Sequence, residues 1–287
     1  MLVELKAVLN LATQHLTAQN VPSPRMNAEL LLMFTLDCDR AYLHAHPERE
    51  LTSEEQKRYD VALGERAQGV PAQYITGHQE FWGLDLIVSP AVLIPRPETE
   101  HVVETALELA QSDDTRRTPH KLRIVDVGTG SGCIALALAK ELPNAEIHAT
   151  DISEAALEIG RANAARHGLE GRVSFHHADL LDGVGHGFDL VVSNPPYVGQ
   201  SEEDQVQLEV RKFEPRNAVF AGPTGSEVIA RLIPQANAVL RSGGWLVMEI
   251  SGTIAAGVSA LLPGWNDISI LPDLQGIPRV VRAKVGH

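Results

Sequence analysis

The chain has 287 residues, of which 44% are hydrophobic, and its 37 acidic and 24 basic side chains give a formal net charge of -13. A chain of this length can bury one large core, or a large core and a small one. The negative charge argues against a broad surface for nucleic-acid phosphates or for an anionic membrane, because such surfaces gather Lys and Arg.

The two cysteines, Cys38 and Cys133, lie far apart and lack CxxC spacing. We therefore expect no disulfide framework, no metal site and a reducing compartment. The longest apolar run, from Cys133 to Ala139, is far shorter than the about 20 residues that a membrane-spanning helix needs. These observations predict a soluble cytoplasmic protein.

The first part of the chain has the spacing of helices. Apolar side chains recur at helical intervals at Leu2, Leu5, Leu9, Ala12 and Leu16. A second helix is expected to begin at Pro24 with Ser23 as its N-terminal cap. Thr52 and Glu55 form the capping-box pattern of a third helix. Residues 1–75 are predicted to be a small helical domain.

The spacing changes after this domain. Between Phe81 and Ile94, apolar and polar residues alternate as in a short strand or hairpin, which makes residues 76–96 a predicted β-hairpin linker. A further helix is expected near Pro97. The polar stretch from Ser112 to His120 is predicted to be a surface connection.

From Lys121 onward, patterns typical of strands and helices alternate, which predicts an α/β fold with a parallel sheet over residues 97–287. The helix candidates are Ile134–Leu142 and Glu154–His167. The strand candidates are Arg123–Val127, Glu146–Thr150, Val173–His176, Phe188–Ser193, Trp245–Ile250, Ile268–Leu271 and Arg279–Ala283.

A glycine-rich turn follows the first of these strands, with the sequence Asp126-Val127-Gly128-Thr129-Gly130-Ser131-Gly132. Glycines let the backbone approach a ligand closely, although a tight turn alone would also need them. The spacing differs from the dinucleotide pattern G-x-G-x-x-G, and no P-loop lysine follows. Asp151 closes the next strand, where a carboxylate can bind both ribose hydroxyls. Its alternative role is a helix cap, for which Ser153 is better suited.

The pattern D-x-G-x-G-x-G with an acid at the end of the second strand resembles the class I S-adenosylmethionine-dependent methyltransferases. The resemblance implies a seven-stranded sheet with a reversed last strand, and S-adenosylmethionine as cofactor. It also implies that Asp179 and Leu180 contact the adenine, although Asp179 can equally be a turn residue. The candidate cofactor-binding residues are Asp126, Gly128, Thr129, Gly130, Ser131, Gly132, Asp151, Ile152, Asp179, Leu180 and Asn194.

The strand candidate Phe188–Ser193 ends at Asn194-Pro195-Pro196-Tyr197, at the sheet edge where open sheets bind ligands. The prolines fix the backbone, so that the Asn194 side-chain oxygen and a backbone carbonyl can both accept hydrogen bonds from one planar NH2 group. Tyr197 can stack on that group or bond beside it. We predict that all four residues bind substrate and that Asn194, Pro195 and Tyr197 are catalytic. The alternative is a plain proline turn.

This tetrapeptide form occurs both in DNA adenine methyltransferases and in protein glutamine methyltransferases, so other segments must decide the substrate. Gln73–Gly77, Glu80–Leu84, Val92–Glu100 and Phe213–Pro215 closely resemble the peptide chain release factor glutamine methyltransferases, over nearly the whole chain. The resemblance implies N5-methylation of the glutamine in the Gly-Gly-Gln motif of class 1 release factors. Ribosomal protein L3 glutamine methyltransferases are close relatives, but the form of Pro95–Glu100 favours the release-factor branch.

Three matters stay open. A DNA adenine-N6 methyltransferase would use the same tetrapeptide but needs a basic groove or a recognition domain, and a noncatalytic cofactor-binding module is a further alternative. Arg96 and Glu98 can either pair with other residues or face the pocket, and Glu249–Gly252 lacks a glutamine that many relatives carry nearby.

We expect a monomer whose helical domain docks the release factor, with no direct nucleic-acid or membrane partner.

Overall fold

The computed structural model describes residues 4–112 and 121–286. The expected helical position at Leu2 and, apart from Ser112, the expected surface connection lie outside the described residues. The chain divides into two units. The helical unit comprises Met1–His78 and Gln207–Phe213, and the sheet unit comprises Gln79–Val206 and Glu214–His287.

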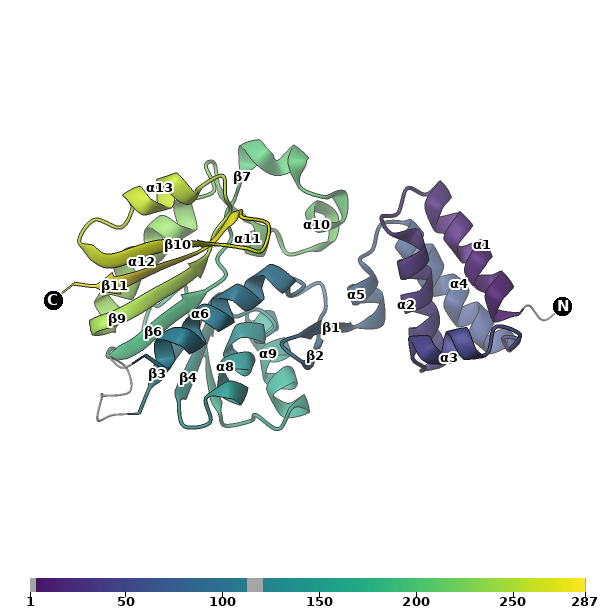
Figure 1. The fold of residues 1–287 in the computed structure, drawn as a ribbon, viewed down its shortest axis with the longest axis horizontal. Coiled ribbons are helices and arrows are strands. Elements are labelled where there is room, and N and C mark those ends of the chain that lie inside the picture. Colours follow the sequence, from purple (N-terminus) through teal and green to yellow (C-terminus); the bar gives the residue numbers. More distant parts are fainter. Residues whose placement is uncertain (1–3, 113–120, 287) are drawn as a thin grey trace. The chain divides into compact units, whose positions relative to one another are not determined.

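The helical unit is a small bundle around an apolar core. Its helices are α1 (Leu5–Ala18), α2 (Pro24–Leu36), α3 (Arg40–Ala45), α4 (Ser53–Ala67), α5 (Ala72–Thr76) and α10 (Leu208–Phe213) (Figure 1). The predicted stripe on α1 is buried from Leu5 to Leu16. Tyr59 of α4 is fully buried, and its hydroxyl donates to the Ala28 carbonyl over 2.9 Å. The bundle thus buries a large aromatic side chain without leaving its polar end unpaired.

Of the two predicted helix caps, one is present in the structure and the other is not. The capping box at α4 is confirmed, because Thr52 accepts from the Glu55 amide and Glu55 accepts from the Thr52 amide. The predicted cap at Ser23 is wrong, because this residue is left-handed, with a φ of 48°, and its side chain makes no capping hydrogen bond. Instead, the Asn27 side chain donates to the carbonyls of Pro22 and Ser23.

Helix α10 follows the tetrapeptide in sequence but belongs to the helical unit. Arg66 of α4 is only 4% exposed. Its guanidinium donates to Asn27 Oδ1 and to Glu209 Oε2 of α10, each over 2.8 Å, and to the Val70 carbonyl over 3.2 Å. A buried guanidinium needs such partners, because an uncompensated charge in an apolar interior is costly. Arg66 therefore holds α10 in this unit.

The sheet unit contains a seven-stranded sheet in the order β10-β11-β9-β6-β3-β4-β5. Its last strand in the chain, β11, runs antiparallel to both β10 and β9, whereas the pairs β9–β6, β6–β3, β3–β4 and β4–β5 are parallel. This topology confirms the α/β fold with a reversed last strand. The strands are β3 (Arg123–Val127), β4 (Glu146–Asp151), β5 (Val173–His177), β6 (Phe188–Ser193), β9 (Leu240–Glu249), β10 (Trp265–Pro272) and β11 (Pro278–Val285).

Helices cover both faces of this sheet (Figure 1). One apolar cluster joins Ile124 of β3 to α6 (Glu100–Ala110), α8 (Cys133–Glu141) and α9 (Glu154–Arg166). The other joins Val125 of β3 to α12 (Glu227–Val239) and α13 (Ala255–Ala260). Successive strand residues point to opposite faces, so a strand covered on both sides needs apolar side chains on each face. In β6, Leu190 and Val191 accordingly pack into opposite clusters.

The remaining elements are short. The alternation after Phe81 corresponds to one hairpin of β1 (His78–Phe81) and β2 (Leu84–Ile87), and the helix expected near Pro97 begins as η1 (Pro97–Thr99) and continues as α6. After the tetrapeptide come β7 (Val198–Gly199), η2 (Gln200–Gln205), α11 (Arg216–Val219) and β8 (Phe220–Gly222). Across the described residues, no helix is both long and apolar enough to cross a membrane.

Candidate active site

A cavity of about 290 Å³ lies where the central parallel strands end. The carboxyl ends of parallel strands meet at one edge of the sheet, which is where open α/β sheets bind their ligands. Its volume is at the lower end of the roughly 300–1,000 Å³ typical of small-molecule sites. The predicted residues that line it are Gly128, Thr129, Gly130, Ser131, Asp151, Ile152, Asp179, Leu180, Asn194 and Pro196.

The glycine turn has the form of a ligand cradle. Gly128 and Gly130 have φ values of 69° and 55°, and a Cβ atom at either position would meet no heavy atom within 4 Å. Both positions border the cavity, so a ligand there can contact the bare backbone. Gly132 is different, because a Cβ would lie 3.2 Å from Leu136 Cδ1 and 3.4 Å from Gly160 Cα. It permits close packing of α8 against α9.

Asp126 supports this turn from behind rather than lining the cavity. Its buried Oδ2 atom accepts from the Thr129 hydroxyl over 2.6 Å and from the Ala135 amide over 3.2 Å. Burial raises the pKa of Asp126 to about 7, although these two hydrogen bonds act in the opposite direction. The side chain thus connects the turn to the start of α8.

Asp151 points into the same cavity from the end of β4. Its Oδ2 atom accepts from the Gly130 amide and its Oδ1 atom from the Ser153 amide, each over 2.9 Å. A carboxylate offers about four acceptor positions, so two remain for a ligand diol. Burial raises the pKa of Asp151, while the backbone amides of Ser153 and Gly130 counteract this rise. The capping role belongs to Ser153, whose hydroxyl accepts from the Ala156 amide.

The pair after β5 also reaches the cavity. Asp179 Oδ2 is bound by the Arg231 guanidinium over 2.6 Å, and both side chains line the cavity. Leu180 has a φ of 56°, which is an unusual conformation for a residue other than glycine. Such backbone strain is often found at ligand sites. The adenine contact of these two residues stays a prediction.

The four residues of the tetrapeptide Asn194–Tyr197 do not all line the cavity. Asn194 and Pro196 line the cavity, whereas Pro195 and Tyr197 do not. The Asn194 Nδ2 atom donates to Thr99 Oγ1 over 3.0 Å. The Tyr197 hydroxyl donates to Glu249 Oε1 over 3.0 Å, and its ring packs against the apolar cluster that contains α12. Burial raises the pKa of Tyr197 far above its usual value. A supporting role fits this position better than stacking on a substrate.

Gly225 holds the loop after β8 against the tetrapeptide. It has a φ of 87°, and a Cβ there would lie 2.6 Å from the Tyr197 carbonyl oxygen and 3.0 Å from the Gly199 nitrogen. Side chains do not tolerate such a distance to backbone atoms. Only glycine therefore lets the two backbones approach this closely.

The proline-rich segment from Ile94 to Thr99, called the bracket below, precedes α6 and is held in place by a buried acid. Glu214, which follows α10, accepts from the Ile94 amide over 3.2 Å through Oε2 and pairs with Arg96 through Oε1. Of the two roles left open for Arg96, the structure shows pairing, and Glu98 of the same bracket is exposed. The two resemblance segments at Val92–Glu100 and Phe213–Pro215 thus meet in one contact.

Two residues of the site were not singled out from the sequence. Thr99 of η1 lines the cavity, and its hydroxyl donates to Glu249 Oε2 over 2.6 Å. Burial raises the pKa of Glu249, whereas the hydrogen bonds from Thr99 and Tyr197 and the charge of Arg279 lower it. Glu249 ends β9, which pairs in parallel with β6. An acid that ends the strand beside the tetrapeptide is a sequence signal that could have identified it.

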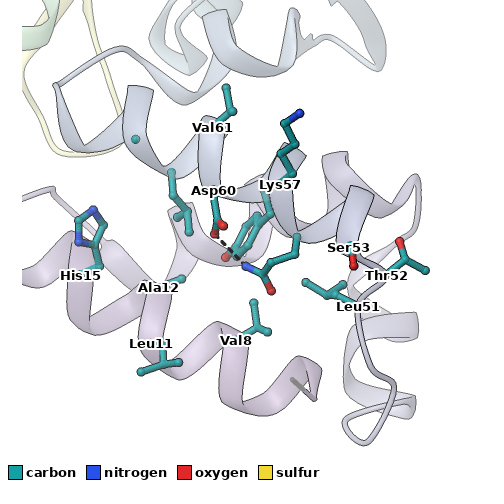
Figure 2. Close-up of a pocket in the computed structure, with 14 residues that line it drawn as sticks. Val8, Leu11, Ala12, His15, Leu51, Thr52, Ser53, Lys57, Asp60 and Val61 are labelled. Atoms are coloured by element: carbon teal, nitrogen blue, oxygen red, sulfur yellow. Dashed lines mark hydrogen bonds between the residues drawn. The ribbon is translucent and has the colours of Figure 1, made fainter. Parts of the chain in front are cut away.

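A second depression, of about 920 Å³, lies in the helical unit between α1 and α4 (Figure 2). No residue of the sheet lines it, so it is not the site of the glycine turn. Leu11 of α1 and Val61 of α4 line it and are 61% and 57% exposed. Exposed apolar side chains around a depression are typical of a protein-binding surface.

The reversed last strand and the glycine turn with its partner acid define an S-adenosylmethionine-dependent methyltransferase. A methyltransferase from Pyrococcus furiosus shares the fold, with a TM-score of 0.51 and 20% identity over 71% of this chain and 90% of that one. Residues 7–77 match the PrmC N-terminal domain, and residues 108–212 match the methyltransferase small domain.

Release factor glutamine methyltransferases are similar along almost the entire chain. The enzyme from Koribacter versatilis is 55% identical over 96% of this chain and 97% of its own length. The enzyme from Chlorobaculum tepidum is 44% identical over 91% of this chain and 90% of its own. The chain therefore belongs to the release factor glutamine methyltransferase family, which confirms the resemblance seen in its motifs.

Proposed function

We propose that this chain transfers the methyl group of S-adenosylmethionine to the side-chain amide N5 of the glutamine in the Gly-Gly-Gln motif of class 1 release factors, an aid to translation termination in the cytoplasm. The observation that carries this proposal is the Asn194 amide at the cavity. Its Nδ2 atom is bound to Thr99, which leaves Oδ1 to accept a hydrogen bond from a planar NH2 group. Family membership supports glutamine as the source of that group.

The residues around the cavity fit S-adenosylmethionine. The bare backbone of Gly128 and Gly130 would lie against it, Asp151 would accept from the ribose hydroxyls, and Asp179 with Leu180 would contact the adenine. When bound, the cofactor supplies a methyl group that its sulfonium makes electrophilic.

The protein contributes mainly alignment and electrostatics. An amide nitrogen is a poor nucleophile because its lone pair is delocalised into the carbonyl, so it must be held in line with the methyl group. Asn194 Oδ1 and a backbone carbonyl of the tetrapeptide would accept from the two N–H groups and orient the nitrogen. Both acceptors stabilise the positive charge that grows on the nitrogen during transfer. The C–S bond would break as the N–C bond forms, with S-adenosylhomocysteine as the leaving group, and the nitrogen would then give its extra proton to water; no covalent enzyme intermediate is needed.

The substrate assignment is tested by incubating the purified chain with labelled cofactor and, separately, a class 1 release factor, ribosomal protein L3 and duplex DNA. We expect label on the release factor, and mass spectrometry should locate one methyl group on the Gly-Gly-Gln glutamine. A release factor in which that glutamine is replaced by glutamate is the matched control and should stay unlabelled. Label on L3 alone or on DNA alone would contradict the assignment.

We further propose that the helical unit docks the release factor through the depression between α1 and α4. The double substitution Leu11→Ser and Val61→Ser should raise KM for the release factor about tenfold, because the free energy gained by burying two apolar side chains on docking is lost. The affinity for S-adenosylhomocysteine should not change. Met26→Ser is a matched control, since Met26 is 56% exposed on α2 and does not line the depression. An unchanged KM in the double variant would refute this docking surface.

A further inference from the structure

A chain of hydrogen bonds connects Asn194 with two buried side chains that are distant from it in sequence. Asn194 Nδ2 donates to Thr99 Oγ1 over 3.0 Å, and Thr99 Oγ1 donates to Glu249 Oε2 over 2.6 Å. Thr99 and Glu249 are each only 1% exposed. Bulk water therefore cannot replace either of their bonds, and the loss of one would leave a buried polar group unpaired.

The carboxylate of Glu249 determines which group donates and which accepts in each of these hydrogen bonds. An ionised carboxylate only accepts hydrogen bonds, and Glu249 receives a second one from the Tyr197 hydroxyl over 3.0 Å. Burial, the largest influence, and the charge of Glu98 raise the pKa of Glu249, while both hydrogen bonds and the charge of Arg279 act against this rise. When Glu249 is ionised, the single hydroxyl hydrogen of Thr99 is directed to Glu249 Oε2. Toward Asn194, Thr99 Oγ1 can therefore only accept.

This direction determines which end of the Asn194 amide faces the cavity. The oxygen and nitrogen of an asparagine amide have nearly the same shape, so packing alone does not choose between them. An acceptor at Thr99 selects Nδ2, which leaves Oδ1 on the opposite side of the amide. The reverse orientation would present an NH2 group to the NH2 group of the substrate, and neither could accept.

We propose that Thr99 and Glu249 are positioning residues that hold the Asn194 amide with its oxygen toward the methyl acceptor. They act through Asn194 and need no contact with the acceptor nitrogen. The inference rests on the proposed function, because only an acceptor nitrogen that carries hydrogens is helped by an oxygen at this position. Nothing in the local sequence of Thr99 indicates this role. It arises from the fold.

Two substitutions at Thr99 separate positioning from packing. Thr99→Val keeps the shape of the side chain but removes the acceptor for Asn194, so kcat should fall about 10- to 100-fold with little change in KM for the cofactor. Thr99→Ser keeps the hydroxyl but loses a methyl group, so it should recover most of the lost rate. If Thr99 only fills space, this order reverses, because serine leaves a cavity and valine does not.

The control is Thr105→Val, since Thr105 is a buried threonine of α6 whose hydroxyl donates to the His101 carbonyl of its own helix. Thermal unfolding and calorimetric binding of S-adenosylhomocysteine check that each variant is folded. Glu249→Asp is a second variant, in which the shortened carboxylate loses its reach to Thr99, and its kcat should fall about tenfold.

The outcomes separate the two proposals. A wild-type chain that does not methylate the release factor would overturn the proposed function and this inference with it. An active wild type together with an unimpaired Thr99→Val variant, a less active Thr99→Ser variant or an unimpaired Glu249→Asp variant would overturn this inference alone.

Discussion

Replacing Asn194 by alanine is expected to lower kcat for release-factor methylation by about 100- to 1,000-fold, the range typical for loss of one preorganised group that stabilises transition-state charge. Asn194 lines the cavity at the end of β6, and its side-chain oxygen is the acceptor that would orient the glutamine NH2 group. Without it, the acceptor nitrogen keeps more freedom relative to the methyl group. Single-turnover methylation with saturating cofactor measures this loss.

Asn194→Asp provides a graded comparison. Aspartate has the same shape and still offers an oxygen to the NH2 group, but it lacks the N–H that Thr99 accepts. It would place an anionic oxygen against Thr99 Oγ1, so its kcat should lie between those of the alanine variant and the wild type. Thermal unfolding should show both variants folded, with a midpoint lowered only by the loss of the hydrogen bond to Thr99. Wild-type kcat in the alanine variant would contradict the mechanism.

Replacing Asp151 by alanine is expected to weaken the binding of S-adenosylhomocysteine by about 100-fold, because charge-assisted hydrogen bonds to two ribose hydroxyls are lost. The same substitution removes the acceptor for the Gly130 amide, so the glycine turn also loses a hydrogen bond that holds it in place. Isothermal titration calorimetry measures the affinity directly, without any methyl acceptor. The loss should appear in Kd and in KM for the cofactor, and less in kcat.

Asp182→Ala is the matched control for this experiment. Asp182 is an exposed aspartate in the loop after Asp179 and does not line the cavity. The control removes one negative charge from the same region and should bind the product as the wild type does. Equal affinities of the Asp151 and Asp182 variants would show that the ribose role of Asp151 is wrong.

The central strands could be predicted from the sequence with little error. Arg123–Val127 and Phe188–Ser193 have the predicted bounds, because each mostly apolar stretch is followed by turn residues, Gly128 after the first and Asn194-Pro195 after the second. β9 begins at Leu240 rather than at the predicted Trp245. The stretch Arg241 to Gly244 has the composition of a turn, yet it continues the strand beside a register shift in the pairing with β6. Tertiary pairing overrides local propensity there.

Other elements were missed for local reasons. Helix α12 contains Pro234 in its interior, and a proline there obscures the helical pattern of the sequence. Helix α3 spans only Arg40–Ala45, too short for apolar periodicity to show. Elements of this kind gain their stability from packing rather than from propensity.

The parts of the site that follow strands were accessible from the sequence, because parallel topology brings their ends together. Gly128, Asp151 and Asn194 all reach one cavity for this reason. The contacts of Thr99 were not accessible, since its partners Asn194 and Glu249 lie 95 and 150 positions away. A hydroxyl that links an amide to a carboxylate has no sequence signature of its own.

The membership of α10 in the helical unit limits how this enzyme can be recombined with its relatives. The unit consists of two separate stretches of chain, and Arg66 in one of them binds Glu209 in the other. Deleting residues 1–75 would leave α10 without Arg66, its binding partner. A chimera that exchanges only the first stretch would place the N-terminal helices of one protein against the α10 of another. Any exchange intended to redirect substrate choice must therefore carry residues 207–213 together with the N-terminal helices.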